Sequence, residues 1–153
     1  MKNAEKSILA LIMALAMIFS LAACAALDSL SAPLTEKVEE MLACSIAGDE
    51  DGAYALLYPG VVERSAYHDL FLQICDYFPI TEDYSLSVMN VTTSKGIGNG
   101  AASTMQGQYQ VEFDGLVYYL FVVHVSNSGG SGFQTFRVVS KAEYDGLQVG
   151  GRA

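Results

Sequence analysis

The fold is decided by residues 103–126, which read STMQGQYQVEFDGLVYYLFVVHVS. Polar and apolar side chains alternate from Ser103 to Phe113, as in a strand with one buried face. Asp114-Gly115 follows, a two-residue sequence that favours the positive φ angles of a tight hairpin turn. Leu116 to Ser126 is then almost continuously apolar. The stretch predicts an antiparallel β-hairpin.

The two-residue turn also predicts how the two strands pair. Phe113 lies opposite Leu116, and the pairs continue as far as Met105 opposite His124. Because directly opposed residues share a face of the sheet, one face collects most of the large apolar side chains. We expect a core face, covered by helices, that holds Met105, Tyr109, Val111, Phe113, Leu116, Tyr118, Leu120, Val122 and His124.

The opposite face of the hairpin is half polar and half apolar. Its polar half is Gln106, Gln108, Gln110 and Glu112, and these residues lie opposite Val123, Phe121, Tyr119 and Val117. A strand that is apolar on both sides is expected to be buried on both sides. We therefore expect partial cover by the C-terminal tail or by another chain. Tyr119 and Phe121 are then candidate interface residues, and a homodimer is one form of that interface.

The remaining elements predict an α+β domain in which N-terminal helices pack on a curved four-stranded antiparallel sheet. Apolar residues at helical spacing predict three helices, over 34–47, over a short segment capped by Asp49 and ended by Pro59-Gly60, and within 61–78. Alternation predicts two further strands, over 84–93 and 133–140. The tail beyond Lys141 is expected to be peripheral, with a turn at Asp145-Gly146.

This order of elements resembles the NTF2-like (cystatin-like) superfamily. The resemblance rests on a first helix ending Ala47-Gly48-Asp49, a tyrosine-bearing helix over 53–58, and four strands from Tyr84. It covers residues 35–140 and implies a cone with a pocket between the helices and the concave sheet. Some members are enzymes that use an Asp, His or Tyr in that pocket, and many are non-catalytic. No enzyme member's catalytic set matches this sequence.

The N-terminus predicts export and a lipid anchor. Lys2 and Lys6 precede an apolar run over 8–19, and Leu21-Ala22-Ala23-Cys24 follows, the order of a secretory signal peptide. The run is shorter than the roughly 20 residues of a membrane-spanning helix. The whole segment through Cys24 is similar to the bacterial lipoprotein signal. That resemblance implies cleavage before Cys24 and a diacylglyceryl group on the Cys24 thiol. The alternative is an ordinary cleaved signal with an incidental cysteine.

These signals predict the domain organisation and the location. Residues 1–23 are the signal peptide, 24–33 the lipidated cysteine and a short tether, 34–141 the NTF2-like domain, and 142–153 the tail. The protein is expected on the outer side of the cytoplasmic membrane, or in the outer membrane if the host is Gram-negative. The part after residue 23 has six basic and sixteen acidic residues, a net charge of −10. Such a surface repels nucleic acid and anionic headgroups, so nucleic-acid binding is excluded.

Candidate chemistry is sparse. His124 lies on the predicted core face with Tyr109 and Tyr118, where a histidine could act as a general base and a tyrosine as a hydrogen-bond donor. No acidic partner is identifiable there; Asp76 and Glu112 are conceivable. The alternative is a histidine hydrogen-bonded at the edge of the core.

Metal and cofactor sites are not expected. Two distant histidines, His68 and His124, and two cysteines lack metal-ligand spacing, and the acidic run over 48–52 lacks the length of a calcium loop. His68 is expected to be a surface residue. Cys44 and Cys75 either form a disulfide, as extracytoplasmic proteins often do, or remain half-buried thiols.

The sequence thus favours a membrane-anchored, non-enzymatic domain that binds a small apolar ligand or a protein partner. The alternative is a small pocket enzyme of the isomerase, dehydratase or hydrolase kind that uses His124 as base. A third interpretation is a structural or inhibitory module that acts through the face around Tyr119 and Phe121.

Overall fold

The computed structural model describes residues 29, 31–98 and 101–150. The chain divides into two units, Met1–Pro33 and Leu34–Ala153. The predicted signal peptide and Cys24 lie outside the described residues. The described residues of the first unit are helical, and the second unit begins with a helix over residues 34–47.

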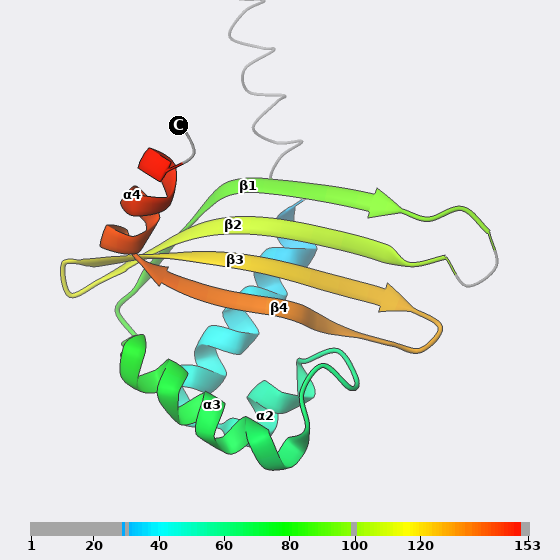
Figure 1. Cartoon of the computed structure of the whole chain (residues 1–153), viewed down its shortest axis with the longest axis horizontal. Helices are drawn as coiled ribbons and strands as arrows, with labels where there is room; N and C mark the ends of the chain where they lie inside the picture. The colour runs from blue at the N-terminus through cyan, green and yellow to red at the C-terminus, as the bar shows by residue number, and fades with distance from the viewer. Residues whose placement is uncertain (1–28, 30, 99–100, 151–153) are drawn as a thin grey trace, which may run out of the picture. The chain divides into compact units, whose positions relative to one another are not determined.

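The second unit is an α+β fold built on one antiparallel sheet of four strands, as predicted. The sheet has the order β1-β2-β3-β4, from β1 (Ser85–Lys95), β2 (Ser103–Phe113), β3 (Leu116–Asn127) and β4 (Gly130–Ser140). The helix that ends at residue 47 crosses one face of this sheet (Figure 1). Two further helices, α2 (Glu50–Ala55) and α3 (Arg64–Tyr77), lie beyond β4, and α4 (Lys141–Gly150) ends the described chain.

The hairpin register is the one that the sequence predicts. Phe113 pairs with Leu116, and the ladder runs without interruption past Met105 opposite His124. Asp114 and Gly115 have φ angles of 50° and 74°, the left-handed values that a tight hairpin turn requires. A local turn therefore sets which side chains of both strands face the core.

The core lies between the inner face of the sheet and the helix over residues 34–47. Tyr109, Val111 and Leu120 are fully buried, and so are Leu34, Val38 and Leu42 from the helix. The close approach depends on Gly107, because a Cβ atom there would lie 2.8 Å from Cδ2 of Leu34 and 2.6 Å from Cε2 of Tyr109. Any larger side chain at residue 107 would force the side chains of Leu34 and Tyr109 to move.

The fourth strand is longer than predicted, beginning at Gly130 and not at Phe133. Its extra residues pair with β3 on one side, while the segment after α2 pairs with β4 on the other. The Tyr58 amide donates to the Phe133 carbonyl at 2.9 Å, and the Phe133 amide donates to the Leu56 carbonyl at 2.8 Å. A Cβ atom at Gly132 would lie 2.4 Å from the Leu57 carbonyl carbon, so only glycine permits this approach.

The predicted turn at Asp145-Gly146 is wrong, because both residues lie inside α4. The helix begins with a capping box over Ser140 and Glu143. The Ser140 amide donates to Oε2 of Glu143 at 2.9 Å, and the Glu143 amide donates to Oγ of Ser140 at 3.4 Å. The Ser-x-x-Glu spacing is the sequence signal from which this helix could have been predicted.

Candidate functional site

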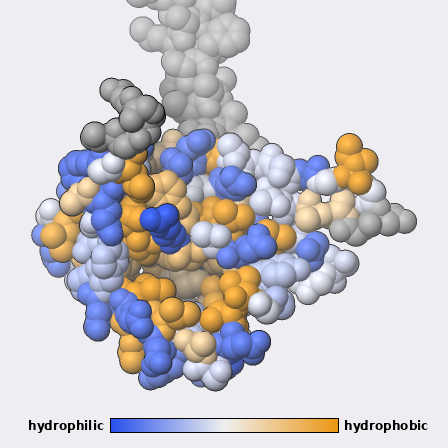
Figure 2. Space-filling model, viewed as in Figure 1, coloured by the Kyte–Doolittle hydropathy of each residue, from blue (hydrophilic) through white to orange (hydrophobic). Residues whose placement is uncertain are grey.

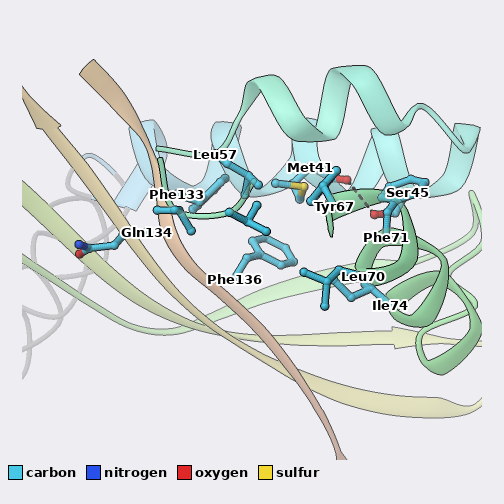
Figure 3. Close-up of a pocket in the computed structure, with 12 residues that line it drawn as sticks. Met41, Ser45, Leu57, Tyr67, Leu70, Phe71, Ile74, Phe133, Gln134 and Phe136 are labelled. Carbon is cyan, nitrogen blue, oxygen red and sulfur yellow. Dashed lines mark hydrogen bonds between the residues drawn. The ribbon is translucent and has the colours of Figure 1, made fainter. Parts of the chain in front are cut away.

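An apolar pocket of about 180 Å³ lies between four parts of the chain (Figure 3). These are the helix over residues 34–47, called the N-terminal helix below, the segment that follows α2, the helix α3 and the strand β4. Phe133 and Phe136 come from β4, and Tyr67, Phe71 and Ile74 come from α3. The rest of the lining is Met41, Ser45, Leu57, Val61, Val62, Leu70 and Gln134. Figure 2 shows the hollow between the sheet and the helices below it, with hydrophobic residues along its rim.

Aromatic rings pack together in the walls of the pocket, whereas two other lining residues are exposed. Phe133 is fully buried and stands edge-on to Phe136, with ring centroids 5.3 Å apart. Tyr67 packs against Phe71 at 5.9 Å. Leu70 and Val61, by contrast, are 43% and 42% exposed. Because these two residues both line the pocket and reach solvent, they lie at its mouth.

Among the described residues, none that lines the pocket carries a charge. The hydroxyl of Ser45 donates to the Met41 carbonyl at 3.0 Å, so its hydrogen is already used (Figure 3). The side chain of Gln134 points away from the other lining residues (Figure 3). Burial, with smaller contributions from Cys44 and Cys75, raises the pKa of Tyr67 to about 12, which keeps its hydroxyl neutral. A ligand here meets an uncharged, largely hydrocarbon surface.

Cys44 and Cys75 are free thiols in the structure, and both are half-buried at the edge of the core. Burial raises the pKa of Cys44, and the nearby carboxylates of Asp49 and Glu40 raise it further. Burial and then Asp76 raise the pKa of Cys75. Both side chains are therefore protonated near neutral pH, which makes them poor nucleophiles.

His124, Tyr109 and Tyr118 share the inner face of the sheet but do not form one site. His124 and Tyr118 are six residues apart on β3, which separates them by roughly 20 Å. The Tyr109 hydroxyl lies 3.3 Å from Oγ1 of Thr35, and the Tyr118 hydroxyl donates to the Tyr77 carbonyl at 3.1 Å. Each tyrosine has a structural partner, and neither lines the pocket.

His124 itself is packed in the core. It is 6% exposed and stands edge-on to the ring of Phe133, with centroids 5.4 Å apart. Its Nδ1 atom is buried without a hydrogen-bond partner among the described residues. Burial lowers the pKa of His124, and the positive charge of Lys37 lowers it further. The conceivable acid Glu112 is exposed on the opposite face of the sheet, where it pairs with Val117. In the described part of the chain, His124 thus has no acidic partner and does not line the pocket.

His68 is exposed, as predicted, but it belongs to a charged cluster that no sequence pattern indicated. Its Nδ1 atom lies 2.7 Å from Oε2 of Glu50, and Arg64 contacts both Glu50 and Asp51. These contacts join α2 to α3 at the surface. Residues 13 to 18 apart in sequence carry no local signal of such contacts, so only the packing of the two helices could reveal them.

The acidic run over 48–52 serves as a helix start. A side-chain oxygen of Asp49 accepts a hydrogen bond from the Gly52 amide at 2.9 Å, as an N-cap does. Within residues 29, 31–98 and 101–150, no group of three or more His, Cys, Asp or Glu side chains is placed to hold a metal ion.

Tyr119 and Phe121 lie on the outer face of the sheet, and the C-terminal helix covers part of them. The ring of Tyr144 stacks on Tyr119 with centroids 3.9 Å apart and lies 6.2 Å from the ring of Phe121. Tyr119 is 9% exposed as a result, whereas Phe121 remains half-buried.

No helix in the described part of the chain is both long and apolar enough to cross a membrane. Comparison of the chain with family models, with curated proteins and with solved structures finds no match.

Proposed function

We propose that this protein is a lipid-anchored binding protein of the cell envelope whose NTF2-like cone holds a small, uncharged apolar ligand. The observation that carries the proposal is the pocket of about 180 Å³ between the helices and β4, lined almost entirely by hydrocarbon. The anchor rests on the predicted lipoprotein signal that ends at Cys24, and the cone rests on the order of helices and strands. Neither the anchor nor the ligand requires a catalytic group.

The size and polarity of the pocket define the ligand class. Apolar cavities of about 150 Å³ bind a single benzene ring. A volume of about 180 Å³ therefore suits one aromatic ring or a short branched alkyl group. An ionised ligand would lose its hydration without gaining a counter-charge, which is unfavourable by several kcal/mol. We expect a neutral ligand, or the neutral end of a larger ligand whose remaining part extends out of the pocket past Leu70.

The ligand can be tested on a chain that begins at Ala25, which removes the predicted signal peptide and Cys24 and keeps the helical residues before the buried Leu34. Toluene, titrated against the protein, should shift the methyl NMR signals of Met41, Leu57 and Ile74. Leu70→Arg should weaken binding at least tenfold, because it places a charged side chain across the mouth. Leu72→Arg is the matched control, because Leu72 is 49% exposed on the same helix and does not line the pocket. Methyl shifts that are absent, or equally lost in both variants, would contradict the proposal.

The anchor is tested separately by intact-mass measurement of the protein from its own host. We expect a chain that begins at Cys24 and carries acyl groups, and a Cys24→Ser variant that is released from membranes. An unmodified mature chain, or cleavage at another residue, would overturn the anchor and leave the pocket untouched.

A further inference from the structure

The outer face of the sheet carries a second concavity, a groove of about 200 Å³. It lies on the side of the sheet away from the N-terminal helix and is separate from the apolar pocket. Asn90 and Thr92 of β1, Gln106 and Gln108 of β2, Phe121 of β3 and Thr135 of β4 contribute to its lining. The proposed apolar ligand makes no use of these residues.

The strand register arranges these side chains in two rows across the sheet. Asn90 pairs with Gln108, and Gln108 pairs with Phe121, which lies opposite the exposed Arg137 of β4. One row therefore runs from two amides through an aromatic ring to a cation beside the groove. In the next row Thr92 pairs with Gln106, and Thr135 follows two strands further on, opposite Val123. Neighbouring strands are about 4.8 Å apart, and side chains on one face of a strand are roughly 7 Å apart. The groove therefore combines polar side chains from β1, β2 and β4 with the apolar side chains of Phe121 and Val123 from β3.

Among the described residues, no charged side chain lines the groove, although the chain carries a net charge of −9. Within the same part of the chain, the side-chain amides of Asn90, Gln106 and Gln108 make no hydrogen bond to another protein group, and Asn90 and Gln106 are exposed. Each amide offers donors and an acceptor together. A sugar hydroxyl is also both a donor and an acceptor, so adjacent hydroxyls can satisfy such an amide fully. The ring of Phe121 is half-buried and can stack against the apolar face of a pyranose.

We infer that this groove binds an uncharged oligosaccharide, with Asn90, Gln106 and Gln108 contacting hydroxyl groups and Phe121 stacking on one sugar ring. Other partners fit less well. An anion is repelled by the acidic chain; Arg137 lies opposite Phe121 at the end of one row, but no cation lines the groove itself among the described residues. A purely apolar ligand would bury the amides without hydrogen bonds. An extended peptide pairs through its backbone at a sheet edge, whereas this groove lies across a face.

The test uses the full chain in dodecylphosphocholine micelles, which contain no sugar, and three neutral hexasaccharides as probes: cellohexaose, chitohexaose and maltohexaose. Nuclear magnetic resonance follows the side-chain NH₂ signals of Asn90, Gln106 and Gln108, which report directly on the groove. We expect at least one probe to shift all three signals in a saturable way. The signal of Gln110 should stay in place, because that residue lies on the same face of the same strand but does not line the groove.

Variants then separate specific binding from general surface effects. Gln108→Ala should weaken binding about threefold to tenfold, the equivalent of one lost hydrogen bond, and Phe121→Ala should weaken it by a similar factor. Gln110→Ala should leave the affinity unchanged. The inference is overturned if no probe shifts the three signals, if Gln110→Ala weakens binding as much as Gln108→Ala, or if the shifts depend on protein concentration in the absence of sugar, which would indicate self-association.

Discussion

The two faces of the sheet differ in what covers them, and the difference separates folding from surface chemistry. On the inner face, Tyr109, Val111 and Leu120 are fully buried beneath the N-terminal helix. On the outer face, Gln106 and Thr135 are exposed, and α4 covers only the end near Tyr119. Because the inner side chains carry most of the burial, the exposed outer ones contribute less to the stability of the fold. Substitutions on both faces and at the two histidines test that division, from the largest expected effect to the smallest.

Leu120→Ala should produce the largest loss of stability. The side chain is fully buried on the inner face, and truncation of such a leucine costs about 2–5 kcal/mol. Gln106→Ala, on the outer face of the partner strand, should change the free energy of unfolding by less than about 0.5 kcal/mol. Chemical denaturation of both variants measures the contrast. Equal losses would show that the two faces do not divide in this way.

Gly107→Ala should destabilise the protein by about 1–3 kcal/mol, because the new methyl group meets Leu34 and Tyr109 at less than 3 Å. The matched control is Gly146→Ala in α4, where a Cβ atom would meet nothing within 4 Å. That change should stabilise the helix by about 0.5–1 kcal/mol. Thermal unfolding of the two variants should therefore shift in opposite directions. A neutral Gly107→Ala would mean that the helix does not approach β2 closely.

Tyr144→Ala should cost about 0.5–1.5 kcal/mol, the value of an aromatic pair, because it removes the ring stacked on Tyr119. Leu147→Ala, at a 55% exposed position of the same helix, is the control and should cost less. The exchange rate of α4 amides with deuterium measures the docking directly. A loss as large as that of Leu120→Ala would make the outer face a second core.

The two histidines should titrate in opposite directions from about 6.5, the ordinary histidine value. The hydrogen bond and charge of Glu50 raise the pKa of His68, whereas burial and then Lys37 lower the pKa of His124. Imidazole proton shifts measure both. The contribution of His68 to stability is present below pH 6.5 and is lost as the pH rises through its folded pKa. The contribution of neutral His124 is present above pH 6.5 and is lost as the pH falls through its folded pKa.

His68→Gln should remove the pH dependence of stability that His68 causes and leave the one that His124 causes. Because His68 is exposed, its substitution should change the free energy of unfolding less than Leu120→Ala, Gly107→Ala or Tyr144→Ala does. A His124 pKa above 6.5 would contradict its placement in a dry core and would reopen a role for it as a base.

The sequence alone predicted the hairpin because its signals are local. Asp114-Gly115 defines a turn, and a two-residue turn leaves no freedom in the register of the strands beside it. The first three helices were also predictable, from apolar spacing and from caps such as Asp49. For the candidate site, the resemblance implied a pocket between helices and sheet but not its lining residues. His124, the candidate base chosen from the hairpin register, does not line the observed pocket.

What the sequence determined by itself was therefore the hairpin, the helices that precede β1, and the face on which each hairpin residue lies, because period and turn type act over a few residues. The tertiary structure decided which segments meet. Phe133 lines the pocket because Gly132 allows the backbone of residues 56–58 to pair with β4, and the outer groove exists because Asn90, Gln108 and Phe121 align across three strands. Contacts between residues dozens of positions apart depend on how whole elements pack, and no local pattern encodes that packing.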